Sequence, residues 1–302
     1  MTNLTVQAKS QAAVSPARRI SSLLFRKPKL RLGLLLAAPL SWLVLIYIAA
    51  LAALLVTAFW TIDSFTSQVQ MGFSLSNIQQ VLTDALYRTV TLRTVGIAIL
   101  VTVVDIVLAL PIAFFMAKIA GPKLRQVLVI AILMPLWASY LVKAYAWRAV
   151  LSHDGILQWI LSPFGGQTPG YGLTAVIITQ GYLWLPYVIL PIFTGLEKVP
   201  NSLLEASSDL GAKNLMTLRT VVLPMLVPAL VAASIFSFSL TLGDYITVNI
   251  VGGASQMLGN LVYTNVGAAN NLPLAAAIAL IPVLLMFGYL AAVRKTGALE
   301  NL

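Results

Sequence analysis

Long apolar runs separated by short polar segments are the dominant pattern of this sequence. A bilayer-spanning helix needs about 20 mostly apolar residues, and six runs reach that length. They cover residues 33–59, 93–117, 126–150, 172–196, 220–243 and 272–293. Pro186 and Pro191 lie inside the fourth run, so we expect that helix to be broken. The pattern predicts an all-α polytopic membrane protein with six transmembrane helices.

Polar segments divide the chain around these runs. The predicted parts are a basic leader at 1–32, a first transmembrane helix at 33–59, an outer segment at 60–92, a core of five further helices at 93–293 and a tail at 294–302. A short helix is expected over residues 76–87, and a polar loop at 197–219 interrupts the core. The leader is long and the run behind it spans a whole bilayer, so we do not expect a cleaved signal peptide.

Basic residues predict the orientation of the chain in the membrane. It has 19 Lys and Arg against 9 Asp and Glu, a net charge of +10. Most of these basic residues lie in the leader, at 118–125, at 197–219 and in the tail, which are alternate segments of the predicted topology. The positive-inside rule therefore places both termini and the 197–219 loop in the cytoplasm. Nucleic-acid binding is not expected, because basic and aromatic residues are not interleaved on a folded domain.

Composition removes several classes of site. The chain has no cysteine, which excludes disulfides, zinc–thiolate sites and cysteine nucleophiles. Its one histidine, His153, lies in a predicted loop and is expected at the surface and not on a metal. No Gly-x4-Gly-Lys-Ser/Thr motif is present to cradle phosphates. We therefore expect no enzyme, no catalytic residue and no cofactor or metal bound by this chain.

The polar loop between the fourth and fifth runs carries the most specific motif. It reads Glu205-Ala206-Ser207-Ser208-Asp209-Leu210-Gly211, and Pro224 follows at a fixed distance. Residues 201–211 predict one short helix that Asn201 caps and that ends at Gly211 in a left-handed turn. Glu205 and Asp209 share one face of this helix. Two like charges at that spacing favour a basic partner surface.

This motif resembles the EAA loop of ABC-importer permeases, with Ser207 in the position of the second alanine. The resemblance implies the type I importer (MetI-like) fold in the bacterial inner membrane. It implies that the 201–211 coupling helix docks on a separate ATPase subunit through Glu205, Ala206, Ser207, Asp209, Gly211 and Pro224. It also implies a transporter with two ATP-binding subunits that hold ATP and Mg²⁺, a second permease subunit that makes a heterodimer, and an external solute-binding protein.

Further segments are similar to the spermidine/putrescine branch of this family. They are the Pro135–Trp147 stretch, the Asn77–Tyr87 stretch, Leu242-Gly243-Asp244-Tyr245 and Leu258-Gly259-Asn260. The similarity implies a polyamine or a related small amine-containing solute. Opines, ferric iron and aminophosphonates, which relatives on the same framework carry, remain alternative substrates. The chain departs from the branch at Leu110, where a tyrosine is frequent, and at Asp105, which takes a usually apolar position.

Ionisable and aromatic residues at membrane depth are the candidates for the solute path. Asp244 stands beside Tyr245, and a carboxylate next to aromatic faces suits an amine through ion pairing and cation–π attraction. The alternative is a solvated loop acid. Asp105 is a candidate for a solute contact or for a structural pair with Lys143, which would otherwise extend to the outer interface. Aromatic candidates for lining the path, or for packing alone, are Trp137, Tyr140, Trp184 and Tyr187.

An ion-coupled secondary transporter, which works without an ATPase, is the alternative function. Such carriers are built from inverted repeats and contain broken helices near the membrane midplane. Pro186 and Pro191 point in that direction, although no internal repeat is visible in the sequence.

Overall fold

The structure is a computed structural model that describes residues 28–63 and 65–294. Most of the predicted leader and the tail beyond Arg294 lie outside these residues. The chain forms two compact units, Met1–Leu54 and Leu55–Leu302, which are described separately. In the first unit, α2 (Pro28–Trp42), the π-helical η1 (Leu43–Ile48) and the first part of α3 (Ala49–Val56) form one helical run. Its side chains from Leu32 to Leu54 are exposed, as expected of a helix that faces lipid.

The second unit begins with a short hairpin and a short helix. The 3-10 turn η2 (Thr57–Phe59) leads into β1 (Thr61–Ile62), which pairs antiparallel with β2 (Val69–Gln70). The Asp63 carboxylate accepts hydrogen bonds from the N–H groups of Phe65 and Thr66, both at 2.9 Å. The backbone N–H of Thr66, and next that of Phe65, hold the pKa of this carboxyl below its usual value.

The predicted helix over 76–87 is two helices. α4 (Ser76–Thr83) ends at Asp84, and the Asp84 side chain accepts a hydrogen bond from the N–H of Leu86 at 2.8 Å. That bond caps the start of α5 (Ala85–Phe114), which continues through the π-helical η3 (Phe115–Ile119). The second transmembrane helix therefore begins before the predicted residue 93.

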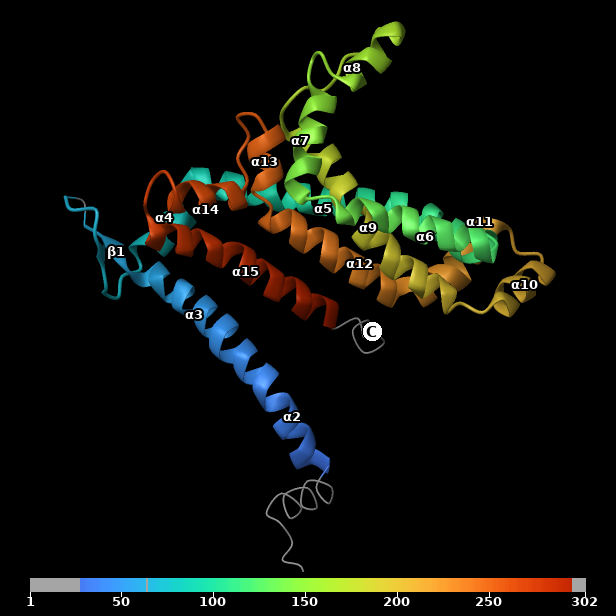
Figure 1. Cartoon of the computed structure of the whole chain (residues 1–302), viewed down its shortest axis with the longest axis horizontal. Coiled ribbons are helices and arrows are strands. Elements are labelled where there is room, and N and C mark those ends of the chain that lie inside the picture. The colour runs from blue at the N-terminus through green and yellow to red at the C-terminus, as the bar shows by residue number, and fades with distance from the viewer. Residues whose placement is uncertain (1–27, 64, 295–302) are drawn as a thin grey trace, which may run out of the picture. The chain divides into compact units, whose positions relative to one another are not determined.

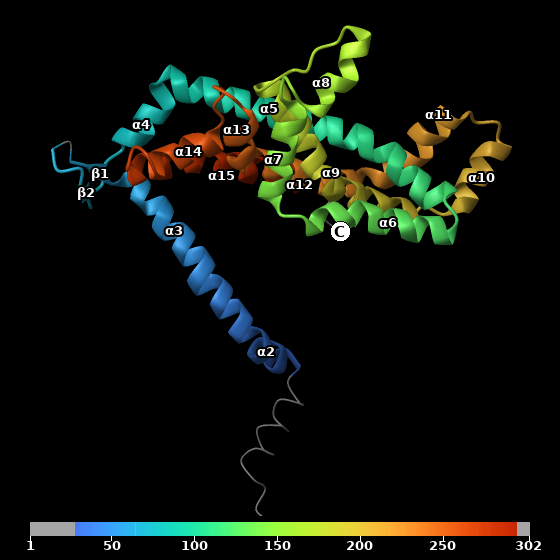
Figure 2. The same ribbon diagram turned by 45° about the horizontal axis from the view of Figure 1, so that its top comes forward.

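Three long helices form the core of the second unit. α5, α9 (Leu173–Glu197) and α12 (Leu223–Gly243) pack against one another, and α15 (Leu272–Arg294) runs beside them (Figure 1). Buried apolar side chains of these helices fill the interior. α14 (Leu258–Val266), α4 and the hairpin lie at one end of this bundle. α10 (Asn201–Asp209) and α11 (Asn214–Thr217) lie at the other end, as both ribbon views show (Figures 1 and 2).

The prediction of a break in the fourth run is wrong. α9 is one uninterrupted helix through both Pro186 and Pro191. Its Pro186 ring is buried between neighbouring helices, and more than half of its apolar window is buried inside the unit. Tight packing on several sides keeps a proline-containing helix together in a membrane protein.

The third run is broken instead. α6 (Pro122–Trp137) and α7 (Tyr140–Leu151) are separated by Ala138 and Ser139, and the path bends by 93°. Pro135 lies inside the last turn of α6, Ala138 has an extended backbone, and the non-helical Ser139 precedes α7. α7, α8 (Ile156–Leu161) and the turn η4 (Ser162–Phe164) leave the bundle sideways (Figure 1). Five helices of the described chain are long and apolar enough to cross a membrane, or six if the bent pair is one span.

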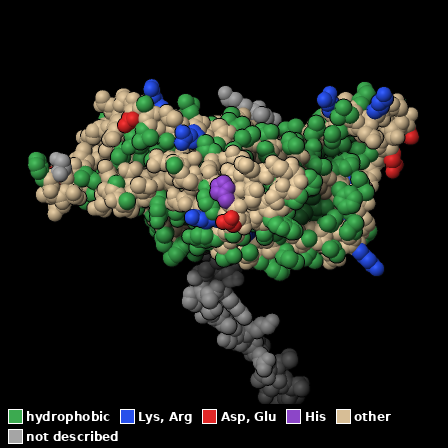
Figure 3. Space-filling view, turned by 90° about the horizontal axis from the view of Figure 1, so that it is seen from above, with side chains coloured by type: hydrophobic (Ala, Val, Ile, Leu, Met, Phe, Trp, Pro, Cys, Tyr) green, Lys and Arg blue, Asp and Glu red, His purple; other side chains and the backbone are tan. Residues whose placement is uncertain are grey.

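The side-chain distribution agrees with this arrangement. Apolar side chains cover much of the face shown in Figure 3, and charged side chains cluster at its right-hand end, where α10 and α11 lie. His153 is exposed, in agreement with the prediction that it lies at the surface.

α13 (Ile246–Val251) packs against α7, and the Arg148 guanidinium donates to the Ile250 carbonyl at 3.1 Å.

Candidate functional site

The predicted docking segment forms a short helix at one end of the bundle. α10 is followed by Gly211, whose φ of +78° gives the left-handed turn expected from the sequence. The N–H of Gly211 donates to the Ser208 carbonyl at 2.8 Å, and the N–H of Ala212 donates to the Ser207 carbonyl at 3.1 Å. This pair of bonds is a Schellman motif, which ends the helix.

The start of α10 differs from the prediction. Pro200 occupies the cap position, and no side chain makes a capping hydrogen bond there. The Asn201 Oδ1 atom accepts a hydrogen bond from Lys118 Nζ at 3.1 Å instead. The predicted Asn201 cap is therefore wrong, because the Asn201 Oδ1 atom accepts its hydrogen bond from Lys118 on the neighbouring helix and not from the α10 backbone.

The outward surface of α10 combines acidic and apolar side chains. Glu205, Ala206 and Asp209 are exposed, and neither acid forms an ion pair with any described residue. Leu203 is 42% exposed and Leu210 is 88% exposed. Unpaired charges beside exposed leucines are typical of a surface that another protein covers.

Ser207 and Pro224, two further predicted docking residues, lie in different surroundings. Ser207 is buried, and its hydroxyl lies 2.8 Å from the hydroxyl of Thr217, which fastens α10 to α11. Pro224 lies in the first turn of α12, directly after the π-helical turn η5 (Leu218–Val222). Of the six predicted docking residues, three are therefore exposed on α10 (Glu205, Ala206 and Asp209). Ser207 is buried beneath the helix, Gly211 ends it, and Pro224 is exposed in the first turn of α12.

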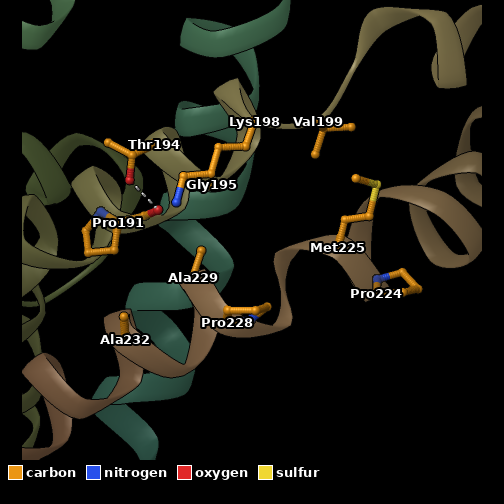
Figure 4. A pocket seen from close by; sticks show the side chains of 10 residues that line it. All are labelled: Pro191, Thr194, Gly195, Lys198, Val199, Pro224, Met225, Pro228, Ala229 and Ala232. Carbon is orange, nitrogen blue, oxygen red and sulfur yellow. Dashed lines mark hydrogen bonds between the residues drawn. The ribbon is translucent and has the colours of Figure 1, made fainter. Parts of the chain in front are cut away.

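A cavity of about 350 Å³ lies between the ends of α9 and α12, and Pro224 is on its wall (Figure 4). Beside it, a Cβ atom on Gly195 would lie 2.5 Å from the Cβ of Ala229. Only glycine therefore permits this close approach of the two helices. The cavity is lined by Pro191, Thr194, Gly195, Lys198, Val199, Pro224, Met225, Pro228, Ala229 and Ala232.

Asp244 lies at the end of α12, and its side chain is buried, with 7% exposed. Its Oδ1 atom accepts hydrogen bonds from the Tyr140 hydroxyl at 2.6 Å and from the Thr247 N–H at 3.1 Å. Its Oδ2 atom accepts one from Gln180 Nε2 at 2.8 Å. The carboxylate thus joins α7, α9 and α12, and it is not the solvated loop acid that the sequence left open.

Aromatic rings extend from this carboxylate along α9. The Tyr140 and Trp184 rings are stacked, with centroids 5.7 Å apart, and the Tyr187 ring lies 6.4 Å from that of Trp184. Trp184 is 7% exposed and Tyr187 is 38% exposed. These three predicted path residues therefore form one continuous group with Asp244.

The other two aromatic candidates lie apart from this group. Trp137 is 83% exposed and stands directly before the break between α6 and α7. Tyr245 stacks on Tyr263, with centroids 4.9 Å apart, and is not among the hydrogen-bond partners of the Asp244 carboxylate. Adjacency in the sequence therefore did not bring Tyr245 into the Asp244 cluster.

Asp105 is fully buried where α5, α9 and α12 meet. Its Oδ2 atom accepts a hydrogen bond from the Ser237 hydroxyl at 2.6 Å. Its Oδ1 atom faces Gly181, where an added Cβ atom would be 3.4 Å away. Lys143 is half-buried and forms no ion pair within the described part of the chain. The structural Asp105–Lys143 pair, one interpretation of the sequence, is therefore not formed among the described residues.

Buried polar atoms without a hydrogen-bond partner lie on the same three helices. Buried polar groups are normally paired, so these atoms retain capacity for water or for a polar solute. Among the described residues they are Asp105 Oδ1, Thr179 Oγ1, Gln180 Oε1, Trp184 Nε1 and Thr241 Oγ1. Residues 28–63 and 65–294 contain no group of three or more His, Cys, Asp or Glu placed to hold a metal ion.

Sequence reasoning missed the partners of both buried acids. Gln180, Ser237 and Thr247 each hydrogen-bond to Asp244 or Asp105. A signal for one of them was present, because Ser237, Thr241 and Asp244 have the spacing of one helix face inside an apolar run. Gln180 on α9 and Thr247 on α13 have no such signal.

A family of known proteins matches most of the core. The model of the binding-protein-dependent transport system inner membrane component matches residues 99–294. The chain belongs to this family. It is therefore a multi-pass permease of the bacterial inner membrane, the membrane subunit of an ABC importer, as the EAA-like loop indicated.

Curated relatives agree with this assignment. The permease is 41% identical to the inner membrane ABC transporter permease protein YdcU of Escherichia coli K12, over 95% of this chain and 98% of that protein. It is 32% identical to the spermidine/putrescine transport system permease protein PotB of the same organism, over 78% of this chain and 86% of that protein. The resemblance to the spermidine/putrescine branch is thereby confirmed.

Solved structures confirm the fold. The permease is similar to a chain of a bacterial ABC transporter involved in the import of the acidic polysaccharide alginate, with a TM-score of 0.66 and 14% identity over 92% of this chain and 99% of that chain. A chain of the alginate transporter in complex with its alginate pentasaccharide-bound periplasmic protein gives a TM-score of 0.69 and 13% identity, over 91% and 96%. At these identities the likeness establishes the type I importer fold alone.

Proposed function

We propose that this permease imports a polyamine or a related small amine-containing solute by alternating access. The observation that carries the proposal is the buried Asp244 carboxylate beside the stacked Tyr140 and Trp184 rings. A carboxylate has about four acceptor positions, and Tyr140, Gln180 and Thr247 occupy three here. The remaining one suits an ammonium donor, and the aromatic faces add cation–π attraction. Similarity to PotB supports the same solute class.

Asp105 extends this path toward the α10 end of the bundle. Its Oδ1 atom is buried on α5 without a partner. The unpartnered side-chain oxygens of Thr179, Gln180 and Thr241 are buried on α9 and α12, which also carry the Asp244 cluster. A polyamine carries several ammonium groups along an extended chain, so it needs more than one acceptor. Trp137 and Tyr245 are exposed and are proposed to face the path in another conformation or to contact the second permease subunit.

ATP hydrolysis is proposed to reside in two partner subunits that bind ATP and Mg²⁺. Glu205 and Asp209 on α10, with the exposed Leu203 and Leu210 around them, would dock on a basic and apolar surface of such a subunit. A second, different permease subunit and an external solute-binding protein complete the proposed transporter. We propose that 197–219 and both termini face the cytoplasm.

Alternating access requires that the partners favour one conformation over the other. ATP binding and loaded binding protein shift the equilibrium only by their differential affinity for the two states. We propose that α10 moves with the ATPase and that the bundle opens outward in response. An ion-coupled carrier is not supported, because the family is defined by dependence on a binding protein and α9 is not a broken helix.

Uptake by the assembled transporter tests the solute class. The complex with its ATPases, partner permease and binding protein is reconstituted in liposomes, and uptake of labelled spermidine and putrescine is measured. Asp244→Asn keeps the size of the side chain and removes its charge. We expect it to lower polyamine uptake about tenfold, on the order of 1.4 kcal/mol for one lost charge contact, with unchanged ATPase content.

Two controls sharpen this experiment. Asp84→Asn removes an exposed acid at the opposite end of the bundle from α10 and should leave uptake unchanged. Opine, ferric iron and aminophosphonate are offered in parallel as competing substrates. Uptake of one of these in place of polyamines, or polyamine uptake that Asp244→Asn does not alter, would overturn the proposed solute contact.

A further inference from the structure

Two basic side chains join the turn between α5 and α6 to the segment that enters α10. Lys118 lies in η3, at the end of the α5 helix. Its Nζ atom donates to the Val199 carbonyl at 2.6 Å and to Asn201 Oδ1 at 3.1 Å. Val199 and Asn201 flank Pro200, so Lys118 holds the link between α9 and α10 on both sides of the proline.

Arg125, near the start of α6, makes the second connection. Its Nε atom donates to the Met116 carbonyl at 3.1 Å and its Nη2 atom to the Ala117 carbonyl at 2.9 Å. Its Nη1 atom contacts the Glu197 carboxylate at the end of α9, at 3.3 Å. Arg125 thus joins η3, α6 and α9 within one side chain.

Both cations donate to carbonyl groups at helix ends. These carbonyls have no backbone N–H of their own helix to bond with. Helix C-termini carry partial negative charge, so a Lys or Arg there is favoured. A polar cavity of about 310 Å³ adjoins these contacts and is lined by Ala117, Lys118, Arg125, Glu197, Val199, Pro200 and Asn201. The connection therefore crosses a hollow and depends on charged hydrogen bonds more than on close packing.

We propose that Lys118 and Arg125 are positioning residues that transmit the movement of α10 to the α5–α6 hairpin. The proposal rests on the proposed function, in which α10 docks on the ATPase. Along the chain, α10 is continuous only with α9 on one side and with α11 and α12 on the other. The Lys118 contacts connect α10 to the end of α5 as well. Arg125 then connects the end of α5 to α6. Because α5 also holds Asp105, this route links the docking end to the buried acids.

Transport efficiency tests the proposal in the assembled transporter. Lys118→Met keeps the length of the apolar stem and removes the donors. We expect the amount of solute imported per ATP hydrolysed to fall several-fold while the ATPase stays bound, and Lys118→Arg to restore part of the loss. Lys123→Met, an equal charge change at an exposed site on α6, is the matched control and should leave the ratio unchanged.

A distance measurement on the permease chain alone gives a second test. The chain has no cysteine, so Ser208→Cys on α10 and Gln126→Cys on α6 accept spin labels selectively. Both sites are exposed. We expect a narrow distance distribution in the parent chain, a broadened one with Lys118→Met, and no change with Lys123→Met.

The results separate this proposal from the proposed function. An unchanged distance distribution with Lys118→Met would overturn the positioning role, as would a fall in uptake that only parallels a lower yield of assembled complex. If the ATPase does not bind through α10 at all, the docking proposal fails. The distance distribution then still decides whether Lys118 fixes α10 to the hairpin.

Discussion

The outward surface of α10 and the cluster around Asp244 are both acidic, but their surroundings are opposite. Glu205 and Asp209 are exposed and have no basic partner among the described residues. Asp244 is buried and holds hydrogen bonds from three groups on neighbouring elements. An unpaired exposed acid costs the fold little, whereas a buried one must be paired. The first kind is free for a partner, and the second ties helices together.

This contrast gives each region a different sensitivity. Changes on α10 should alter assembly with other subunits and leave the bundle stable. Changes at the buried acids should alter the stability of the bundle and leave the docking surface in place. Assembly with the ATPase and thermal stability, measured on the same variants, therefore distinguish the two regions.

The largest effect is expected for Glu205→Lys. Reversing the charge at the centre of the α10 surface would oppose a basic partner, and a contact of this kind is worth about 2 kcal/mol or more, roughly thirtyfold in affinity. We expect the ATPase to be lost on purification and uptake to be abolished, with the melting temperature of the permease unchanged. Co-purification and a thermal unfolding assay measure both. A Glu205→Lys variant that retains its ATPase and imports normally would contradict docking through α10.

A smaller effect is expected for Ser237→Ala. This substitution should lower the stability of the bundle and leave assembly with the ATPase unchanged. The substitution removes the only hydrogen bond to the Asp105 carboxylate that the structure shows. A buried polar group left unpaired costs about 1–3 kcal/mol. We expect a lower melting temperature in detergent with a normal amount of bound ATPase. Ser239→Ala, whose hydroxyl donates only to the Phe236 carbonyl on an exposed face, is the control. Equal melting temperatures for the two variants would show that Asp105 does not depend on Ser237.

The smallest effect is expected for Leu210→Ser. Leu210 is 88% exposed, so its loss removes little from the permease itself. Full burial of a leucine side chain is worth about 1.5–3 kcal/mol, and partial burial in an interface correspondingly less, about 1 kcal/mol. We expect ATPase binding to weaken about fivefold, with unchanged melting temperature. Titration of the purified ATPase onto the permease in nanodiscs measures the affinity, and no change in it would remove Leu210 from the docking surface.

Several features of the fold and site were predictable because they are local. The apolar runs indicated the spans, since a bilayer leaves only helices as a solution for a long apolar segment. Gly211 ends α10 in a left-handed turn, which depends only on the lack of a side chain at that residue. The exposure of Glu205 and Asp209 followed from a short polar helix between two membrane runs.

Other features depended on residues far apart in the chain. Lys118 takes the acceptor of Asn201 that was expected to cap α10. Asp105 pairs with Ser237 on α12 and not with Lys143. Tyr140, and not the adjacent Tyr245, joins Asp244. Such partners are selected by which helix faces pack together, and the spacing of residues along one helix does not show which helix lies opposite.

Hydropathy and turn chemistry act over a few residues, so the sequence alone predicted a membrane-embedded chain with a short polar helix that ends at Gly211. The resemblance of its motifs then indicated an ABC-importer permease. Only the tertiary structure decided where the helices break. α9 stays whole through Pro186 and Pro191, since its neighbours pack around it. The third run breaks after Pro135 at Ala138 and Ser139, where α7 turns to meet α13. A proline permits a break, and the packing around it determines whether the helix bends.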